Sequence, residues 1–157
     1  MGRMYLTFMT RTPASIEISE LRKRLRIAID ERRKATAARR TALDAAAAAY
    51  TDLLELTATP LVQKLANALR AEGHNFTVFT PNGGLRMALA KSADDFIEFA
   101  LDTSQDEPFV ALQVNRSRGR RVVQHERPVK GRTPVDRLSE EDVLQALLDE
   151  IAPFVER

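Results

Sequence analysis

The sequence predicts one α+β domain with long N-terminal helices, a five-stranded antiparallel sheet and a C-terminal helix packed on that sheet. The apolar residues recur at helical spacing before Gly73, at every second position after it, and at helical spacing again after Ser139. A chain of 157 residues with 44% hydrophobic residues is long enough to bury one core. Within this single domain, 1–157, we expect an N-terminal arm and long helix at 1–57 and an α+β core at 58–157.

Residues 16–57 are expected to form one long helix or two in line. Their apolar positions alternate in steps of three and four, which is the heptad seam of a coiled coil, although Arg32 and Arg39 interrupt it. A single amphipathic helix of this length needs a second surface to cover it, so the seam predicts self-association, most simply as a homodimer. The predicted self-association residues are Leu21, Leu25, Ala28, Ala35, Ala42, Ala46, Ala49 and Leu53.

A second helix is expected to begin at Thr59, with Thr59 as its N-cap and Pro60 in its first turn. Gly73 is predicted to end this helix, because glycine readily adopts the left-handed conformation found after helix C-termini.

The next part of the chain predicts an antiparallel meander. Pro81–Gly84 contains Asn82-Gly83, a strong signal for a hairpin turn, and a second turn is expected at Ser117–Arg120. One face of the sheet is expected to be covered and the other exposed to solvent. The predicted strands are 76–80, 85–90, 96–102, 109–116 and 121–129.

The C-terminal helix is predicted from a capping box, with Ser139 as N-cap and Asp142 three residues later. Pro153 is expected to stop it. At the other end of the chain, residues 4–10 alternate weakly and predict a short strand or an apolar arm, which Pro13 terminates.

The charges are strongly segregated, although the formal net charge is only +2. Residues 11–40 contain ten Lys or Arg against four Asp or Glu, and residues 114–132 contain seven against one. Residues 93–107 contain six acidic residues and no basic one, and residues 136–157 contain seven acidic residues against two basic ones. This layout predicts an oriented surface for an anionic partner or for the oppositely charged face of another subunit.

The two basic tracts raise the hypothesis of a nucleic-acid-binding protein, with a basic helix at 22–40 and a basic hairpin at 116–121. Arginine side chains there could contact phosphates, with little base specificity because no aromatic residue is interleaved. The alternative for both tracts is a solvated surface that keeps the protein soluble. The predicted contact residues are Arg22, Lys23, Arg26, Arg33, Arg40, Arg116, Arg118, Arg120 and Arg121.

A hydrolase that uses the strand carboxylates Glu98 and Asp102 is a third hypothesis, but strand alternation alone explains this pair. His125 and Glu126 are neighbours on a predicted strand and so point to opposite faces. With two histidines and no cysteine, the sequence predicts no metal site, cofactor, catalytic residue or small-molecule substrate.

The leading hypothesis is therefore a non-enzymatic protein-interaction module: an adaptor, a chaperone-like accessory or an assembly subunit. We expect it to act as a homo-oligomer and to bind another protein through the helical arm and the exposed sheet face. No apolar run is long enough to span a bilayer, and the N-terminus lacks the features of a signal peptide. The absence of cysteine fits a reducing, cytoplasmic compartment.

Overall fold

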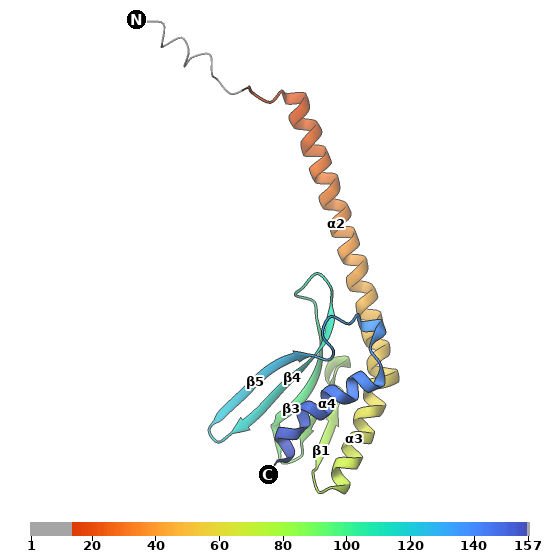
Figure 1. Cartoon of the computed structure of the whole chain (residues 1–157), viewed down its shortest axis with the longest axis vertical. Coiled ribbons are helices and arrows are strands. Elements are labelled where there is room, and N and C mark those ends of the chain that lie inside the picture. The colour runs from red at the N-terminus through yellow and green to blue at the C-terminus, as the bar shows by residue number, and fades with distance from the viewer. Residues whose placement is uncertain (1–13, 157) are drawn as a thin grey trace, which may run out of the picture. The chain divides into compact units, whose positions relative to one another are not determined.

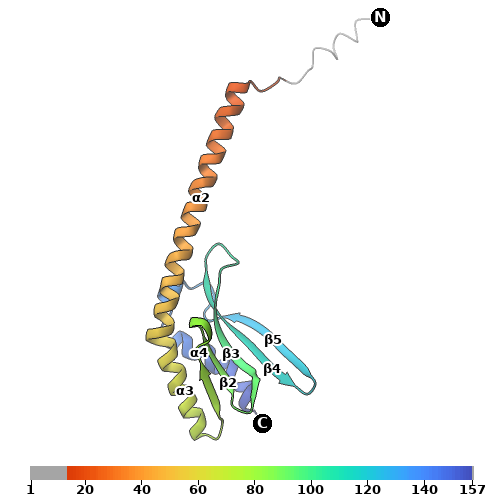
Figure 2. The ribbon, with the colours of Figure 1, turned by 180° about the vertical axis from the view of Figure 1, so that it is seen from behind.

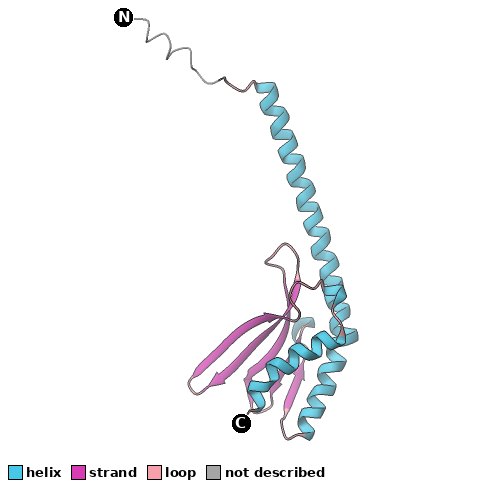
Figure 3. Cartoon of the chain, viewed as in Figure 1, coloured by secondary structure: helices cyan, strands magenta, loops and turns pink. Residues whose placement is uncertain are grey.

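The computed structural model describes residues 14–156 of the chain. The contacts divide the chain into two compact units, Met1–Ala38 and Arg39–Arg157, and so group residues 39–57 with the second unit. The predicted strand or arm at residues 4–10 and the break at Pro13 lie outside the described residues. The predicted fold class is confirmed: a long N-terminal helical stretch, five antiparallel strands and a C-terminal helix (Figures 1 and 3).

An α-helix does begin at Thr59 with Pro60 in its first turn, as predicted, but it follows the preceding helical segments without a break. The prediction that Thr59 is the N-cap is wrong, because the position before the helix is Ala58, which has a helical backbone. Thr59 makes no side-chain cap, and its backbone N–H donates to the carbonyl oxygen of Leu54, five residues back. Pro60 has no N–H and would clash with the carbonyl group four residues before it, and a wider π turn relieves this conflict. The successive segments are the α-helix α2 (Ile18–Asp52), a π-helical turn (Leu53–Ala58) and the α-helix α3 (Thr59–Ala71).

The predicted end of α3 at Gly73 is confirmed. Gly73 has a positive φ of 87°. Its N–H donates to the carbonyl oxygen of Arg70 at 3.0 Å, and the N–H of His74 donates to that of Leu69 at 2.8 Å. These two bonds use carbonyl groups that would otherwise lack partners at the end of the helix.

The sheet is the predicted meander, with neighbouring strands in chain order. Its hairpins turn at Asn82 and Gly83, which have φ values of 48° and 77°, and at Gly119, with φ 66°. The third strand begins at Ser92 rather than at residue 96, and its pairing with the second strand is shifted after Ala88. The strands are β1 (Phe76–Phe79), β2 (Leu85–Leu89), β3 (Ser92–Asp102), β4 (Phe109–Arg118) and β5 (Arg121–Pro128).

One face of the sheet forms the core together with α3 and α4 (Glu140–Val155). The register aligns apolar side chains across the central strands, as in the row Met87–Ile97–Val114. Figure 1 shows α4 in front of the sheet, and Figure 2 shows the sheet from its other face, in front of α4. The helices of the second unit thus leave the opposite sheet face uncovered.

The start of α4 is as predicted, because Ser139 and Asp142 form both hydrogen bonds of the capping box. The predicted stop at Pro153 is wrong, since the helix continues to Val155. The proline removes one backbone donor near the end of the helix, where Phe154 anchors the last turn. Phe154 is buried and packs edge-to-face on Phe76, with 6.2 Å between the ring centroids.

Candidate functional site

The most distinctive surface of the first unit is an apolar stripe on α2. No residue of α2 is buried, and four large aliphatic side chains on one side of its first part are between 42% and 68% exposed. Their spacing of three or four residues places them along one side of the helix. We call them the arm stripe: Ile18, Leu21, Leu25 and Ile29.

The predicted self-association residues do not share one environment. Leu21, Leu25, Ala28, Ala35 and Ala42 are exposed. The last three residues of the seam are used by the second unit itself, because Leu53 is buried in the core and Ala46 and Ala49 pack against it. The exposed part of the seam therefore ends before Ala46.

The predicted basic contact residues of α2 are all exposed: Arg22, Lys23, Arg26, Arg33 and Arg40. None of them forms an ion pair with a described residue. Arg24, by contrast, pairs with Glu20 one turn earlier, at 3.2 Å. Four of the contact residues, at positions 22, 26, 33 and 40, lie on one side of the helix by its 3.6-residue period and so form a basic stripe.

The predicted basic hairpin is formed by β4 and β5, with Arg118 opposite Arg121 and Gly119-Arg120 as the loop. Arg118, Arg120 and Arg121 are exposed, whereas Arg116 is half-buried. Within residues 14–156, none of these four arginines forms an ion pair.

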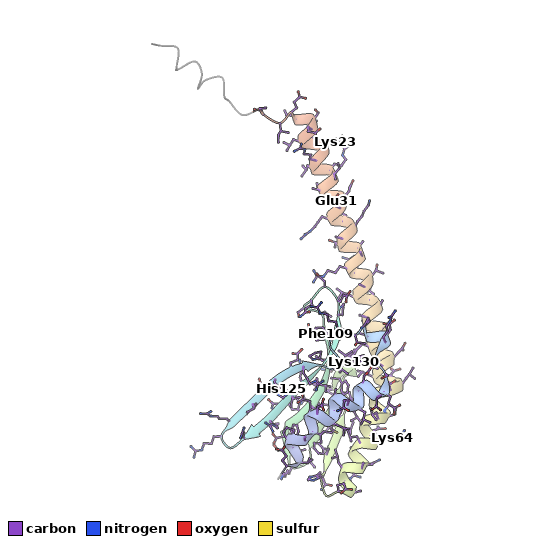
Figure 4. The ribbon with its side chains drawn as sticks, in the orientation of Figure 1. Lys23, Glu31, Lys64, Phe109, His125 and Lys130 are labelled. Atoms are coloured by element: carbon purple, nitrogen blue, oxygen red, sulfur yellow. The ribbon has the colours of Figure 1, made fainter. Side chains whose placement is uncertain are left out.

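Other basic residues of the same tract serve the fold instead. The register places Arg127 beside Leu112 and His125 beside Val114, so both lie on the covered face of the sheet. The side chain of Arg127 lies 3.1 Å from Asp149 of α4. His125 is labelled on β5 in Figure 4, and its Nε2 atom lies 2.7 Å from Oε2 of Glu150.

Sequence reasoning missed this connection between β5 and α4. It found no partner for His125, because the partner is distant in the sequence and lies on another element. One signal was present: the alternation of β5 places charged residues where an inward-facing strand normally carries apolar ones. Lys130, which follows β5, forms another ion pair with α4: its Nζ atom lies 3.1 Å from Oδ1 of Asp142.

The carboxylates considered for a hydrolase have separate partners. Glu98 accepts two hydrogen bonds of 3.2 Å from Arg86, whose guanidinium lies 3.9 Å from the ring centroid of Phe96. Asp102 accepts a 2.9 Å hydrogen bond from the backbone N–H of Ser104. The hydroxyl and N–H of Ser104 lower the pKa of this carboxyl, so they favour its charged form.

Two kinds of site are absent from the part of the chain that the structure describes. It contains no group of three or more His, Cys, Asp or Glu residues arranged to hold a metal ion. It also contains no helix that combines the length and the apolar character needed to cross a bilayer.

Comparisons of the chain with protein-family models, curated proteins and solved structures found no match. Distinctive surfaces within residues 14–156 include the arm stripe, the adjacent basic residues of α2, the arginines of the hairpin and the uncovered face of the sheet.

Proposed function

We propose that this protein is a non-enzymatic interaction module that assembles with a second copy of itself through the arm stripe of α2. The observation that carries this proposal is the exposure of four large aliphatic side chains on one side of a helix in which no residue is buried. An isolated helix gains little stability from its own hydrogen bonds, and packing of its apolar side normally stabilises it.

The gain expected from pairing is substantial. Complete burial of an aliphatic side chain stabilises by about 1.5–3 kcal/mol, and these side chains are already partly shielded. Pairing would therefore contribute on the order of 1 kcal/mol for each of the four side chains in each copy. The alanine residues that follow along the seam allow two helices to approach closely.

The charges beside the stripe favour a second copy as the partner. If Ile18 takes the first heptad position, Arg24 and Glu31 both take the last, at the edge of the seam. In an antiparallel pair, Arg24 of each copy would face Glu31 of the other. In a parallel pair, Glu31 would lie beside Arg32 of the other copy. Its negative charge would then offset the positive charge that Arg32 places within the seam. Either orientation brings opposite charges together.

Sedimentation equilibrium of the full chain tests the proposal. We expect the wild type to be a dimer at micromolar concentration and Leu25→Asp to be a monomer, because the carboxylate would have to be buried in the seam. Ile27→Asp is the matched control, since Ile27 is 48% exposed but lies on the opposite side of the helix. A monomeric wild type, or equal effects of both substitutions, would overturn the proposal.

The orientation of the pair can be read by disulfide cross-linking, because the chain has no cysteine of its own. In a parallel, in-register pair, Leu21→Cys lies opposite itself and forms a disulfide dimer on mild oxidation. In an antiparallel pair, the two cysteines are far apart and the same variant stays uncross-linked.

A second candidate function is nucleic-acid binding, which the basic stripe of α2 favours. Its arginines are exposed and form no ion pair within the described residues, so they are available for phosphates. Fluorescence anisotropy of labelled DNA and RNA over a salt series tests it. Binding should weaken steeply with salt, and replacing Arg26 and Arg33 by glutamine should flatten that dependence by about two phosphate contacts. Absence of binding at low salt excludes this candidate.

A further inference from the structure

A cleft of about 620 Å³ opens in the second unit, beside the C-terminal ends of α3 and α4. Its wall comes from five parts of the fold: the residues after α3, the end of β2 with the turn that follows it, Asp95 of β3, the end of β4, and the end of α4. The lining residues that matter here are His74, Leu89, Lys91, Arg116, Arg118 and Phe154.

Strand alternation explains why two arginines enter this cleft. Arg116 and Arg118 follow Val114 at every second position of β4, so all three side chains lie on the covered face of the sheet. Val114 is the last residue of β4 that belongs to the core, and the two arginines follow it along the strand. Their side chains therefore line the space past the end of the core.

The cleft holds more cationic groups than its acidic groups neutralise. Lys91, Arg116 and Arg118 form no ion pair with any described residue. The two acidic residues in the wall are Asp95 and Glu156. The carboxylate of buried Asp95 is already engaged, since it accepts a hydrogen bond from the backbone N–H of Ser117.

Arg116 is the most informative of these groups because it is half-buried. Withdrawing a charge from water without a counter-ion is unfavourable, and a bound anion would remove that penalty. An arginine also presents its donors as a planar fork that fits the oxygen atoms of a phosphate or a carboxylate. Leu89, Pro153 and Phe154 also line the cleft and supply apolar surface.

We infer that this cleft binds a small phosphate ester, with the phosphate on Lys91, Arg116 and Arg118 and its organic group against Phe154. Three cationic groups in one cleft match a dianionic phosphate better than a single carboxylate. This inference is independent of the pairing of α2, because every lining residue belongs to the second unit.

Isothermal titration calorimetry of the full chain with phenyl phosphate tests the inference. We expect millimolar or tighter binding, weaker binding of inorganic phosphate, which lacks the apolar group, and weaker binding of benzoate, which carries one negative charge. Arg116→Gln and Arg118→Gln should each weaken the binding of phenyl phosphate about tenfold or more, the usual effect of losing a charged hydrogen bond.

The hairpin supplies the matched control. Arg120 and Arg121 lie on the same hairpin but do not line the cleft. Arg120→Gln and Arg121→Gln should therefore leave the affinity for phenyl phosphate within about twofold of the wild-type value. Glu156→Gln should strengthen binding, because it removes a negative charge from the wall.

Two outcomes would overturn the inference. If substitutions of the cleft arginines and of the loop arginines weakened the binding of phenyl phosphate equally, the ligand would be attracted by the positive charge of the hairpin in general and not by the cleft. No binding at millimolar concentration, together with a lowered melting temperature of Arg116→Gln, would show that the cationic groups serve the carbonyl groups at the two helix ends instead.

Discussion

The carboxyl group of Asp142 does two things for the fold at once. Its Oδ2 atom accepts a 3.0 Å hydrogen bond from the backbone N–H of Ser139, and its Oδ1 atom lies 3.1 Å from Nζ of Lys130. The N–H of Ser139, followed by Lys130, lowers the pKa of this carboxyl below the ordinary aspartate value of 3.8. Asp142 therefore joins the start of α4 to the segment that follows β5.

The first prediction concerns Asp142→Asn. A lowered pKa in the folded state contributes stability that is present above the ordinary pKa and is lost as the pH falls below it. The variant should therefore have a lower free energy of unfolding than the wild type at pH 7, and this difference should shrink at pH 3. Urea denaturation at both pH values measures it.

Asp136→Asn is the control for that comparison. Asp136 is exposed and lies in the short 3₁₀ turn before α4 (Val135–Arg137), but it forms no ion pair with a described residue. Its replacement should leave the dependence of stability on pH unchanged. A difference for Asp142→Asn that stays constant between pH 7 and pH 3 would show that the lost contact is not that of a charged carboxylate.

Tyr50 gives a second prediction, at the alkaline end. Burial, with a smaller effect of the charge of Glu98, raises its pKa from 10.0 to about 12. A raised pKa means that the folded protein holds the proton longer, so the stability that Tyr50 contributes is lost as the pH rises from 10 towards 12. An absorbance titration of tyrosinate should show a late step near pH 12 that is missing in Tyr50→Phe. An unchanged late step in that variant would contradict the prediction.

At the scale of elements, the end of α3 provides a prediction with a single physical cause. Gly73 has a φ of 87°, and a Cβ atom placed on it would meet no atom within 4 Å. Gly73→Ala should therefore destabilise the protein by about 1 kcal/mol through backbone strain alone. Gly73→Asn should destabilise it less, because asparagine tolerates the left-handed region better. Thermal unfolding of the three proteins gives the order, and equal melting temperatures would contradict it.

Elements that depend on neighbouring residues could be predicted from the sequence, whereas elements that depend on contacts between distant residues could not. The capping box at Ser139, the turn at Gly73 and the Asn82-Gly83 hairpin depend on neighbouring residues, and all three were predicted correctly. The π-helical turn before Thr59 was not, because buried side chains on both sides of Pro60 hold the helix together across it.

Contacts between side chains that are distant in the sequence could not be predicted either. The pairing of His125 with Glu150 depends on how α4 lies against β5. The cleft at Arg116 depends on where two helices end. Local patterns locate the strand and the helix but do not bring them together. The apolar seam of α2 was visible in the sequence, but its division at Ala46 into exposed and covered parts was not.

At the scale of the whole molecule, the residues of the buried core come from a limited part of the chain. All described buried residues lie between Leu53 and Phe154, and the seam residues that pack against them begin at Ala46. The first compact unit ends at Ala38, before any of these. The residues needed to bury the core therefore belong to the second unit.

The last prediction follows from this division. Deleting residues 1–38 should change the free energy of unfolding by no more than about 0.5 kcal/mol, at concentrations where the full chain is monomeric, because none of the described residues 14–38 has a buried side chain. The same deletion should abolish dimerisation, because it removes the arm stripe. Urea unfolding and sedimentation equilibrium of the two proteins measure both effects. Loss of the fold would mean that residues 1–38 stabilise the second unit directly, whereas a truncated protein that still dimerises would place the dimer contact within residues 39–157, on surfaces such as the uncovered face of the sheet.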